Sequence, residues 1–262
     1  MPLTARRLAS GYAAREPIVT VVPAESLTIL SYNVYNHHEG SAAFEHRARA
    51  IMNVIAEAGA DLVCVQEAPS PEFLRWLAAE LTQRQRRHMR VACTEMRRPD
   101  GWTEHLGIVH PGTMRVASVH AAPTGEHIAI SIQVPRPALT IVSAHLNPHS
   151  AETREAQARQ LLAELRAAGP LVVCGDFNAS RDDLAMIVLT TELEPLAPAP
   201  GVARTFPTAL RSDLPGGGGG VVDHILGRGV VVEASGIVGD APADGMWASD
   251  HVAVWARLGL RP

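Results

Sequence analysis

The stretch LVVCGDFN, residues 171–178, joins an apolar β-like run to the polar residues Asp176 and Asn178. Side chains alternate across a strand, so two residues that lie two positions apart point to the same side of an extended segment. Catalytic groups concentrate where rigid scaffold meets solvent at the end of a strand. The stretch therefore predicts a buried strand that delivers two polar side chains to one edge of a sheet. A turn capped by Asn178 is the alternative for that asparagine alone.

The same pattern, a polar cluster beside an apolar run, occurs at five other places in the chain. In order, Leu27–Leu30 leads into Asn33, Asp61–Val65 into Glu67, Leu139–Ala144 into His145 and Asn147, and Val221-Val222 into Asp223, while Asp250 and His251 precede Val252–Trp255. One such cluster carries little information. The ordered set predicts a divalent-metal site with two histidines. These are the groups needed to hydrolyse a phosphate ester.

These motifs resemble those of the endonuclease/exonuclease/phosphatase superfamily. The resemblance extends from about Leu27 to Leu258, and its most specific pieces are GDFN at 175–178 and SDH at 249–251. Supporting pieces are Thr205-Phe206-Pro207 and Arg154-Glu155-Ala156-Gln157. The resemblance implies a four-layered α/β sandwich, in which two mixed β-sheets pack face to face and helices flank them, with the site at one end of the sheet pair.

The candidate metal ligands are Asn33, Glu67 and Asp250. A hard divalent cation prefers carboxylate oxygen, and Mg²⁺ keeps several waters beside one or two protein carboxylates. The resemblance implies that the amide oxygen of Asn33 and the carboxylate of Asp250 approach the same ion as Glu67. We therefore expect Mg²⁺, with Mn²⁺ as a substitute, and we leave open whether one or two ions bind.

The candidate catalytic residues are His145, Asp176, Asn178, Asp223 and His251. The resemblance implies that Asp223 orients His251, which acts either as a base or as a protonated phosphate clamp, and that His145 is a leaving-group acid or phosphate donor. It also implies that Asp176 positions or deprotonates the attacking water and that Asn178 hydrogen-bonds the phosphate. A lone histidine would more often be a surface or core residue, so only the context selects these two.

Asn147 and Trp247 are candidates for substrate binding. Asn147 lies two positions beyond His145, and Trp247 lies on an expected loop two positions before Ser249, where it could form a wall for an apolar substrate group. Segment 102–110, WTEHLGIVH, departs from the family pattern because it offers no tyrosine or arginine to grip phosphate. The five glycines at 216–220 predict a flexible connection, with a lid over the substrate as the alternative.

Composition and patterning bound the other expectations. The 262-residue chain is 47% hydrophobic and 19% charged, which predicts a single domain over 26–262 after an extension over 1–25. Helices are expected at Phe44–Ala58, Glu72–Leu81 and Ala151–Ala168, and short strands at Met114–His120, His127–Val134 and Leu139–Ala144. A strand, a helix, a long loop and three strands should follow.

No apolar run is long enough to span a membrane. The odd count of three cysteines suggests core thiols in the cytoplasm.

The leading functional hypothesis is a Mg²⁺-dependent phosphoesterase that hydrolyses a small-molecule or lipid-like phosphate ester by direct attack of water. The net charge of −4 and the absence of lysine weigh against the first alternative, a DNA or RNA nuclease, because nucleic-acid binding needs a basic surface. The densest basic stretch, Arg84–Arg90, is expected to be a solvated helix end. The second alternative is a non-catalytic or repurposed member acting on a metabolite. Neither the exact substrate nor the oligomeric state follows from the sequence.

Overall fold

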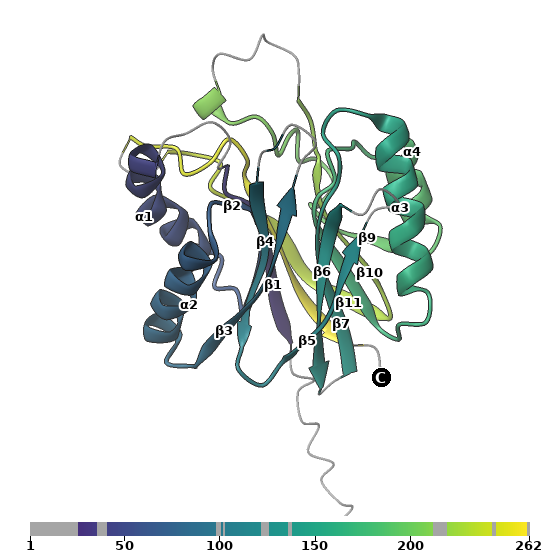
Figure 1. Cartoon of the computed structure of the whole chain (residues 1–262), viewed down its shortest axis with the longest axis horizontal. Helices are drawn as coiled ribbons and strands as arrows, with labels where there is room; N and C mark the ends of the chain where they lie inside the picture. The colour runs from purple at the N-terminus through teal and green to yellow at the C-terminus, as the bar shows by residue number, and fades with distance from the viewer. Residues whose placement is uncertain are drawn as a thin grey trace, which may run out of the picture.

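The computed structural model describes residues 26–35, 41–97, 101, 103–121, 126–135, 138–211, 219–242 and 245–260, so the predicted extension over 1–25 lies outside the described residues. The described chain forms four layers in the order helix, sheet, sheet, helix (Figure 1). Two six-stranded mixed sheets face each other, α1 and α2 cover one, and α3 and α4 cover the other. This arrangement confirms the predicted four-layered sandwich.

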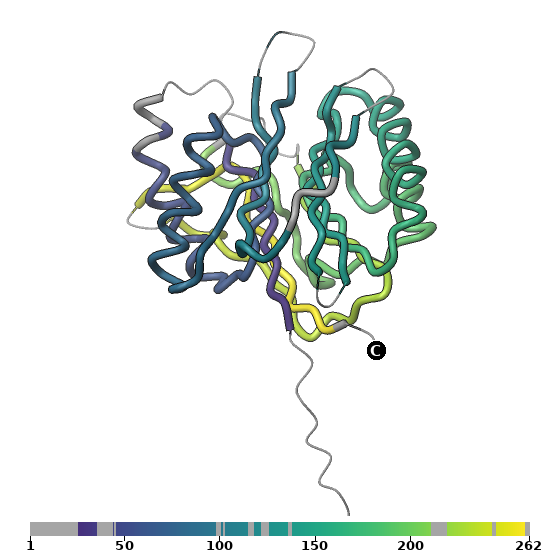
Figure 2. Tube along the Cα trace, turned by 60° about the horizontal axis from the view of Figure 1, so that its bottom comes forward, coloured from purple at the N-terminus to yellow at the C-terminus, as the bar shows by residue number. Residues whose placement is uncertain are grey.

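The first sheet has the strand order β11 (Val230–Val238), β12 (Ala253–Leu260), β1 (Leu27–Asn33), β2 (Leu62–Ala68), β4 (Thr103–Pro111) and β3 (Met89–Arg97). The second has the order β5 (Arg115–Ala121), β6 (His127–Pro135), β7 (Ala138–His145), β8 (Leu171–Asp176), β10 (Asp223–Arg228) and β9 (Glu194–Ala197). The first and last strands of the described residues lie in the same sheet, because β1 pairs antiparallel with β12, and the two run side by side in Figure 2.

The helices are α1 (Ser41–Glu57), α2 (Pro71–Gln85), α3 (Ala151–Leu165), α4 (Leu184–Thr190) and a short 3-10 helix at Ala209–Arg211. Ser70 caps α2 as expected, accepting a hydrogen bond from Phe73 N at 3.2 Å. The expected end of α3 at Ala168 was wrong. The helix ends at Leu165, and the Arg228 side chain donates hydrogen bonds to the carbonyls of Leu165 and Ala168. The short edge strand β9 was not anticipated.

Alternation along the central strands divides the apolar residues among three cores. In β1, Ile29 packs between the sheets, whereas Leu30 packs beneath α1 and α2. In β8, Val172 faces the other sheet and Val173 faces α3 and α4. Because both faces of these strands are covered, they appear in the sequence as continuous apolar runs.

The cysteines fit this packing. Cys64 and Cys174 are buried in the core between the sheets, Cys93 is exposed on β3, and all three are free thiols. None of the helices among the described residues is long and apolar enough to cross a membrane.

Candidate active site

The strand ends gather the candidate residues at one end of the sandwich. Asn33 ends β1, and His145 and Asp176 end the parallel strands β7 and β8, where they are register partners. Asp223 begins β10, which runs antiparallel to β8, and it is the register partner of Asp176 on the other side. Strand alternation turns all four toward the space between the sheets, in phase with core residues such as Ile29.

A buried polar layer separates this site from the apolar core. Gln66 donates from Nε2 to Ser143 Oγ at 3.1 Å, across the two sheets, and accepts at Oε1 from Ser31 Oγ at 3.5 Å. All three side chains are buried. Their hydrogen bonds satisfy groups that would otherwise destabilise the interior, so the interior changes stepwise from apolar to polar to ionisable along the strands.

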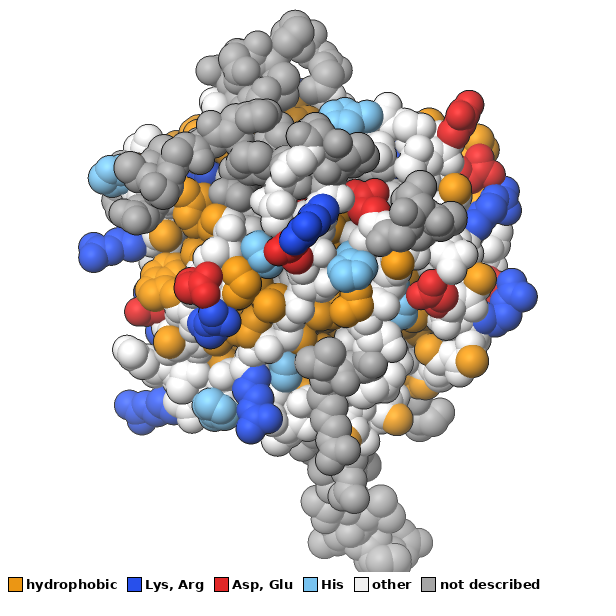
Figure 3. Space-filling model, in the orientation of Figure 1, with side chains coloured by type: hydrophobic (Ala, Val, Ile, Leu, Met, Phe, Trp, Pro, Cys, Tyr) orange, Lys and Arg blue, Asp and Glu red, His pale blue; other side chains and the backbone are white. Residues whose placement is uncertain are grey.

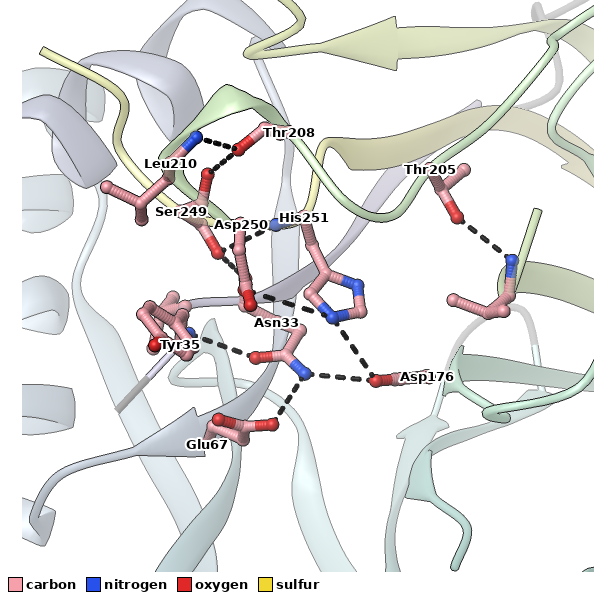
Figure 4. Close-up of polar contacts among 12 residues, drawn as sticks. Asn33, Tyr35, Glu67, Asp176, Thr205, Thr208, Leu210, Ser249, Asp250 and His251 are labelled. Carbon is pink, nitrogen blue, oxygen red and sulfur yellow. Dashed lines mark hydrogen bonds and ion pairs between the residues drawn. The ribbon is translucent and has the colours of Figure 1, made fainter. Parts of the chain in front are cut away.

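Asn33 joins two carboxylates at the centre of the site (Figure 4). Its Nδ2 donates to Glu67 Oε1 and to Asp176 Oδ2, both at 3.0 Å. Its Oδ1 accepts from the backbone N–H of Tyr35 at 3.0 Å. Because a backbone N–H can only donate, this contact assigns the amide oxygen. The structure thus turns the nitrogen of Asn33, and not the oxygen, toward the carboxylates.

His251 and Asp223 form the first of two buried acid–histidine pairs. His251 Nδ1 lies 2.9 Å from Asp223 Oδ2, the contact that the sequence predicted. Burial disfavours the charged imidazole, but the neighbouring carboxylates of Asp223 and Asp176 outweigh it and raise the pKa of His251 well above its usual range. The free nitrogen, Nε2, faces Asp176 Oδ2 at 3.6 Å.

The second pair contains a residue that the sequence analysis missed. His145 Nδ1 lies 2.9 Å from Glu104 Oε1, and both side chains are 1% exposed. His145 Nε2 lies 3.6 Å from Asp176 Oδ2. Glu104 is on β4, in phase with Leu106 and Ile108 of the core between the sheets. An acidic residue in phase with inward apolar positions was the signal that the sequence offered for it.

The backbone is left-handed at three non-glycine residues of this end. Tyr35, Glu67 and Asn178 have φ values of 52°, 54° and 49°. At Glu67 the pairing between β2 and β4 also shifts register, between Val65 and Ala68. Such conformations are costly for L-residues and cluster at functional sites. The shift turns Glu67 out of the strand alternation and toward Asn33.

Gly175 of the GDFN motif is required by a close approach of two strands. A Cβ atom on this residue would lie 1.9 Å from the carbonyl oxygen of Ala144 on β7. Any larger residue would therefore push β8 away from β7 and separate His145 from Asp176.

Asn178 and Asn147 contact the backbone. Asn178 Nδ2 donates to the Leu146 carbonyl at 3.0 Å, and its backbone N–H donates to Asp176 Oδ1 at 2.8 Å. Asn147 Oδ1 accepts from the N–H groups of His149 and Ser150 at 2.8 and 2.9 Å. Both amides therefore shape the loop after His145, and their contacts with a substrate stay predictions.

The REAQ segment supports the same loop. Gln157 Oε1 accepts from the Asn147 N–H at 2.8 Å, and Arg154 donates to the Asn147 carbonyl at 3.2 Å while pairing with Asp183 at 2.8 Å.

The loop that carries Asp250 and Trp247 is fixed to the end of β1. Ser249 Oγ donates to the Asn33 carbonyl at 2.7 Å, and buried Arg47 of α1 donates to the carbonyl of Ala248 at 2.6 Å and to that of Val34 at 3.0 Å. Asp250 is buried, with Oδ1 3.9 Å from His251 Nε2. Trp247 is half-buried.

The donor set suits a hard divalent cation. Ligand atoms of Glu67, Glu104 and His145 lie within 4.8 Å of one another, as do those of Asp176, Asp223 and His251. These groups offer carboxylate oxygen and imidazole nitrogen, and Asp223 Oδ1 is buried without a hydrogen-bond partner among the described residues. Carboxylate and imidazole groups this close together could hold a divalent metal ion.

A cavity of about 930 Å³ lies away from this site, at the opposite end of the sandwich. Its walls include Leu27, Met114 and Leu139, and Arg87 and His88 line it as well. None of the candidate site residues lines it. Among the described residues, the candidate site residues therefore gather at the other end of the sandwich from this cavity.

Comparisons with known proteins agree with this fold. The sequence model of the endonuclease/exonuclease/phosphatase family matches residues 30–251. The fold is similar to that of a functionally unknown conserved protein from Enterococcus faecalis V583, with a TM-score of 0.68 and 20% identity over 90% of this chain and 100% of that one.

Two further solved structures are similar. They are D. rerio TDP2 complexed with a single-strand DNA product (TM-score 0.68, 18% identity, 89% of this chain and 99% of that one) and the human Nocturnin catalytic domain with a bound sulfate anion (TM-score 0.66, 18% identity, 90% and 95%). At these identities the likeness shows the fold alone. No curated protein matches the chain.

Proposed function

Because the chain belongs to the endonuclease/exonuclease/phosphatase family, we propose that it is a Mg²⁺-dependent hydrolase of phosphoric esters that acts on a small-molecule or lipid-like substrate. Water attacks phosphorus directly, with no covalent enzyme intermediate. The observation that carries the proposal is the convergence of two carboxylate-backed imidazoles on one carboxylate oxygen, since His145 Nε2 and His251 Nε2 each lie 3.6 Å from Asp176 Oδ2.

Glu67 and Asp250 would hold the ion, with Mn²⁺ as a substitute. Bound there, a divalent cation supplies charge that offsets the developing negative charge on a phosphoryl group. The amide oxygen of Asn33 accepts the Tyr35 N–H and keeps a second lone pair, so its ligation of the ion stays part of the proposal. Its Nδ2 atom also orients Glu67 and Asp176.

The remaining steps belong to the chain's own side chains. Asp176 accepts the proton of the attacking water, since its Oδ2 atom lies where both imidazoles converge. His251, whose raised pKa favours the imidazolium, donates from Nε2 to a phosphoryl oxygen. Asp223 fixes its tautomer and orientation through Nδ1. His145, oriented by Glu104, protonates the leaving group.

The charge distribution supports a compact substrate over polymeric nucleic acid. The chain carries a formal charge of −4, and the arginines on the face drawn in Figure 3 are interspersed with acidic side chains. The basic stretch Arg84–Arg90 runs from the last turn of α2 into the start of β3, and its Arg87 lines the cavity at the end opposite the site. Electrostatic binding of nucleic acid would need basic groups beside the catalytic centre.

Trp247 is our candidate for the wall of the substrate pocket. It is half-buried, and Met246 next to it is 39% exposed. An apolar surface so near Ser249 would suit the organic part of an ester. Trp247→Ala should then raise KM and leave the metal requirement unchanged, whereas an unaltered KM would assign that side chain to packing. Asn147 would contact the substrate only in addition to its loop bonds.

The three free thiols favour a reducing compartment, the cytoplasm.

A panel of phosphate-release and nuclease assays tests the function. Small phosphate monoesters and diesters, lysophospholipid micelles and plasmid DNA would be incubated with Mg²⁺, with Mn²⁺ and with EDTA. We expect metal-dependent turnover of an ester, lost in Glu67→Gln and His251→Asn and retained in the exposed control Glu57→Gln. Preferred cleavage of plasmid DNA would establish the nuclease alternative. Absence of any metal-dependent product would favour the non-catalytic or repurposed alternative.

A further inference from the structure

Segment 205–208 connects the two chain segments that supply the His251–Asp223 pair. Thr205 Oγ1 accepts hydrogen bonds from the backbone N–H groups of Val222 at 3.0 Å and Asp223 at 3.1 Å. The hydroxyl of Thr205 therefore holds the start of β10, the strand that carries Asp223.

The same segment holds the loop that carries His251. The Thr205 carbonyl accepts from the Val252 N–H at 2.9 Å. The Thr208 N–H donates to the Asp250 carbonyl at 2.7 Å, and Thr208 Oγ1 donates to the Ser249 carbonyl at 2.7 Å. Hydrogen bonds thus fix the segment to the residues on both sides of His251 as well as to the Asp223 strand.

Between these two threonines, Phe206 covers the imidazole of His251. The ring centroids are 4.7 Å apart and the ring planes are inclined by 34°. Phe206 is itself anchored, because it exchanges two backbone hydrogen bonds with Gly220, at 3.1 and 2.9 Å. At Gly219, φ is 147° and a Cβ atom would lie 2.4 Å from the Phe206 carbonyl oxygen and 2.3 Å from Pro207 Cδ. Only glycine fits against this backbone.

We propose that Phe206 is a positioning residue for His251 in the phosphoesterase reaction, so the inference rests on the proposed function. The hydrogen bond from Nδ1 to Asp223 fixes one ring atom, but one bond leaves the imidazole free to tilt about it. The aromatic face removes this freedom and keeps Nε2 directed at Asp176, 3.6 Å away. Reacting groups displaced by about 1 Å can lose about a hundredfold in rate.

The kinetic test compares Phe206→Leu with Phe206→Tyr on the full chain. Phe206→Leu keeps much of the volume but removes the aromatic face, and we expect kcat to fall about tenfold to a hundredfold with KM changed by less than about twofold. Phe206→Tyr retains the ring and should restore most of the rate. Phe73→Leu is the matched control, since Phe73 is a buried aromatic of α2 that packs on Phe44 at 4.9 Å. It should reduce stability and leave kcat unchanged.

A measurement that needs no enzyme activity distinguishes a failure of this inference from a failure of the proposed function. The His251 Nδ1 proton, assigned by its loss in His251→Asn, should exchange slowly with solvent in the wild type and faster in Phe206→Leu. If no substrate is turned over, the proposed function fails and this exchange rate still decides on Phe206. Should Phe206→Leu not fold, Gly219→Ala displaces Phe206 without altering its ring and should give the same acceleration. Unchanged exchange and unchanged kcat in the folded variants would overturn the proposal.

Discussion

His145 and His251 approach the same atom, Oδ2 of Asp176, each with its Nε2 atom at 3.6 Å. They come from different layers, since His145 ends β7 in one sheet and His251 precedes β12 in the other. Each Nδ1 lies 2.9 Å from a buried carboxylate, that of Glu104 or Asp223. Both imidazoles are therefore held with Nδ1 beside a carboxylate and with Nε2 directed at the shared atom of Asp176.

Removal of the proposed metal ligand should abolish catalysis without unfolding the protein. Glu67 is only half-buried and contributes to the site through Asn33 and the proposed ion. We expect Glu67→Ala to lower kcat/KM by about a hundredfold or more while circular dichroism stays unchanged. EDTA should inactivate the wild type, and added Mg²⁺ should restore it. Full activity in EDTA would contradict the metal dependence.

The His251–Asp223 pair should behave as a unit. Asp223→Asn should impair turnover nearly as much as His251→Ala, because the imidazole loses its orienting carboxylate. The double variant should lose little more than either single variant. A double-mutant cycle on kcat/KM measures this coupling. Simply additive losses would show that the two side chains act independently.

Glu104 should matter to turnover as Asp223 does. Glu104→Gln keeps the shape but replaces the carboxylate beside buried His145 with an amide. We expect kcat to fall by at least about tenfold, since proton transfer by a positioned side chain typically contributes about a hundredfold or more. Glu95→Gln, on the neighbouring strand β3, is the control because its side chain is 42% exposed. Equal rates for the two variants would show that His145 does not need Glu104 for turnover.

DNA cleavage should be weak and insensitive to salt. Each phosphate contact on duplex DNA contributes a slope of roughly −0.9 in log affinity against log salt. Because the chain has a net charge of −4 and no lysine, we expect small esters to be turned over faster than plasmid DNA at both low and moderate salt. Efficient plasmid cutting that declines steeply with salt would instead reveal a basic groove.

His224 should make the fold less stable in mild acid. Burial is the main cause that lowers the pKa of His224 to about 4, and its Nε2 donates to the Ala179 carbonyl at 3.0 Å. The unfolded chain therefore binds a proton at a higher pH than the folded chain does. Stability is present above about pH 6.5 and is lost as the pH falls toward 4, by about 2 kcal/mol between pH 7 and pH 5 from this group. Urea unfolding at both pH values would measure it, and His224→Gln should flatten this part of the profile.

The sequence was sufficient to predict the four layers and to predict that the strand ends meet at one edge. Runs such as Leu171–Cys174 predict strands covered on both faces, and parallel neighbours place their carboxyl ends at one edge. The helix ends were less predictable. The boundary of α3 depends on Arg228, 60 residues or more away from the carbonyls that it binds, and no local pattern contains that contact.

The finer geometry of the site also depends on contacts between distant segments. Glu104 meets His145 because β4 and β7 lie in facing sheets, a pairing that no sequence spacing expresses. The direction of the Asn33 amide follows from the Tyr35 N–H, which the left-handed backbone of that residue places within reach. Asn178 was expected to point at the phosphate, yet its amide donates to the Leu146 carbonyl. For the two asparagines, a backbone group competes for the polar side chain.

The left-handed residues Tyr35, Glu67 and Asn178 set a trade-off for anyone who tries to engineer this protein. Each holds a conformation that costs most L-residues about 1 kcal/mol or more, asparagine less, and that glycine adopts freely. A laboratory selection for heat resistance alone would therefore tend to replace these side chains with glycine. At Glu67 such a replacement would remove the proposed metal ligand. That substitution would thus raise the stability of the fold and remove the proposed catalytic activity. Stabilising substitutions should therefore avoid these three residues and begin in the helices.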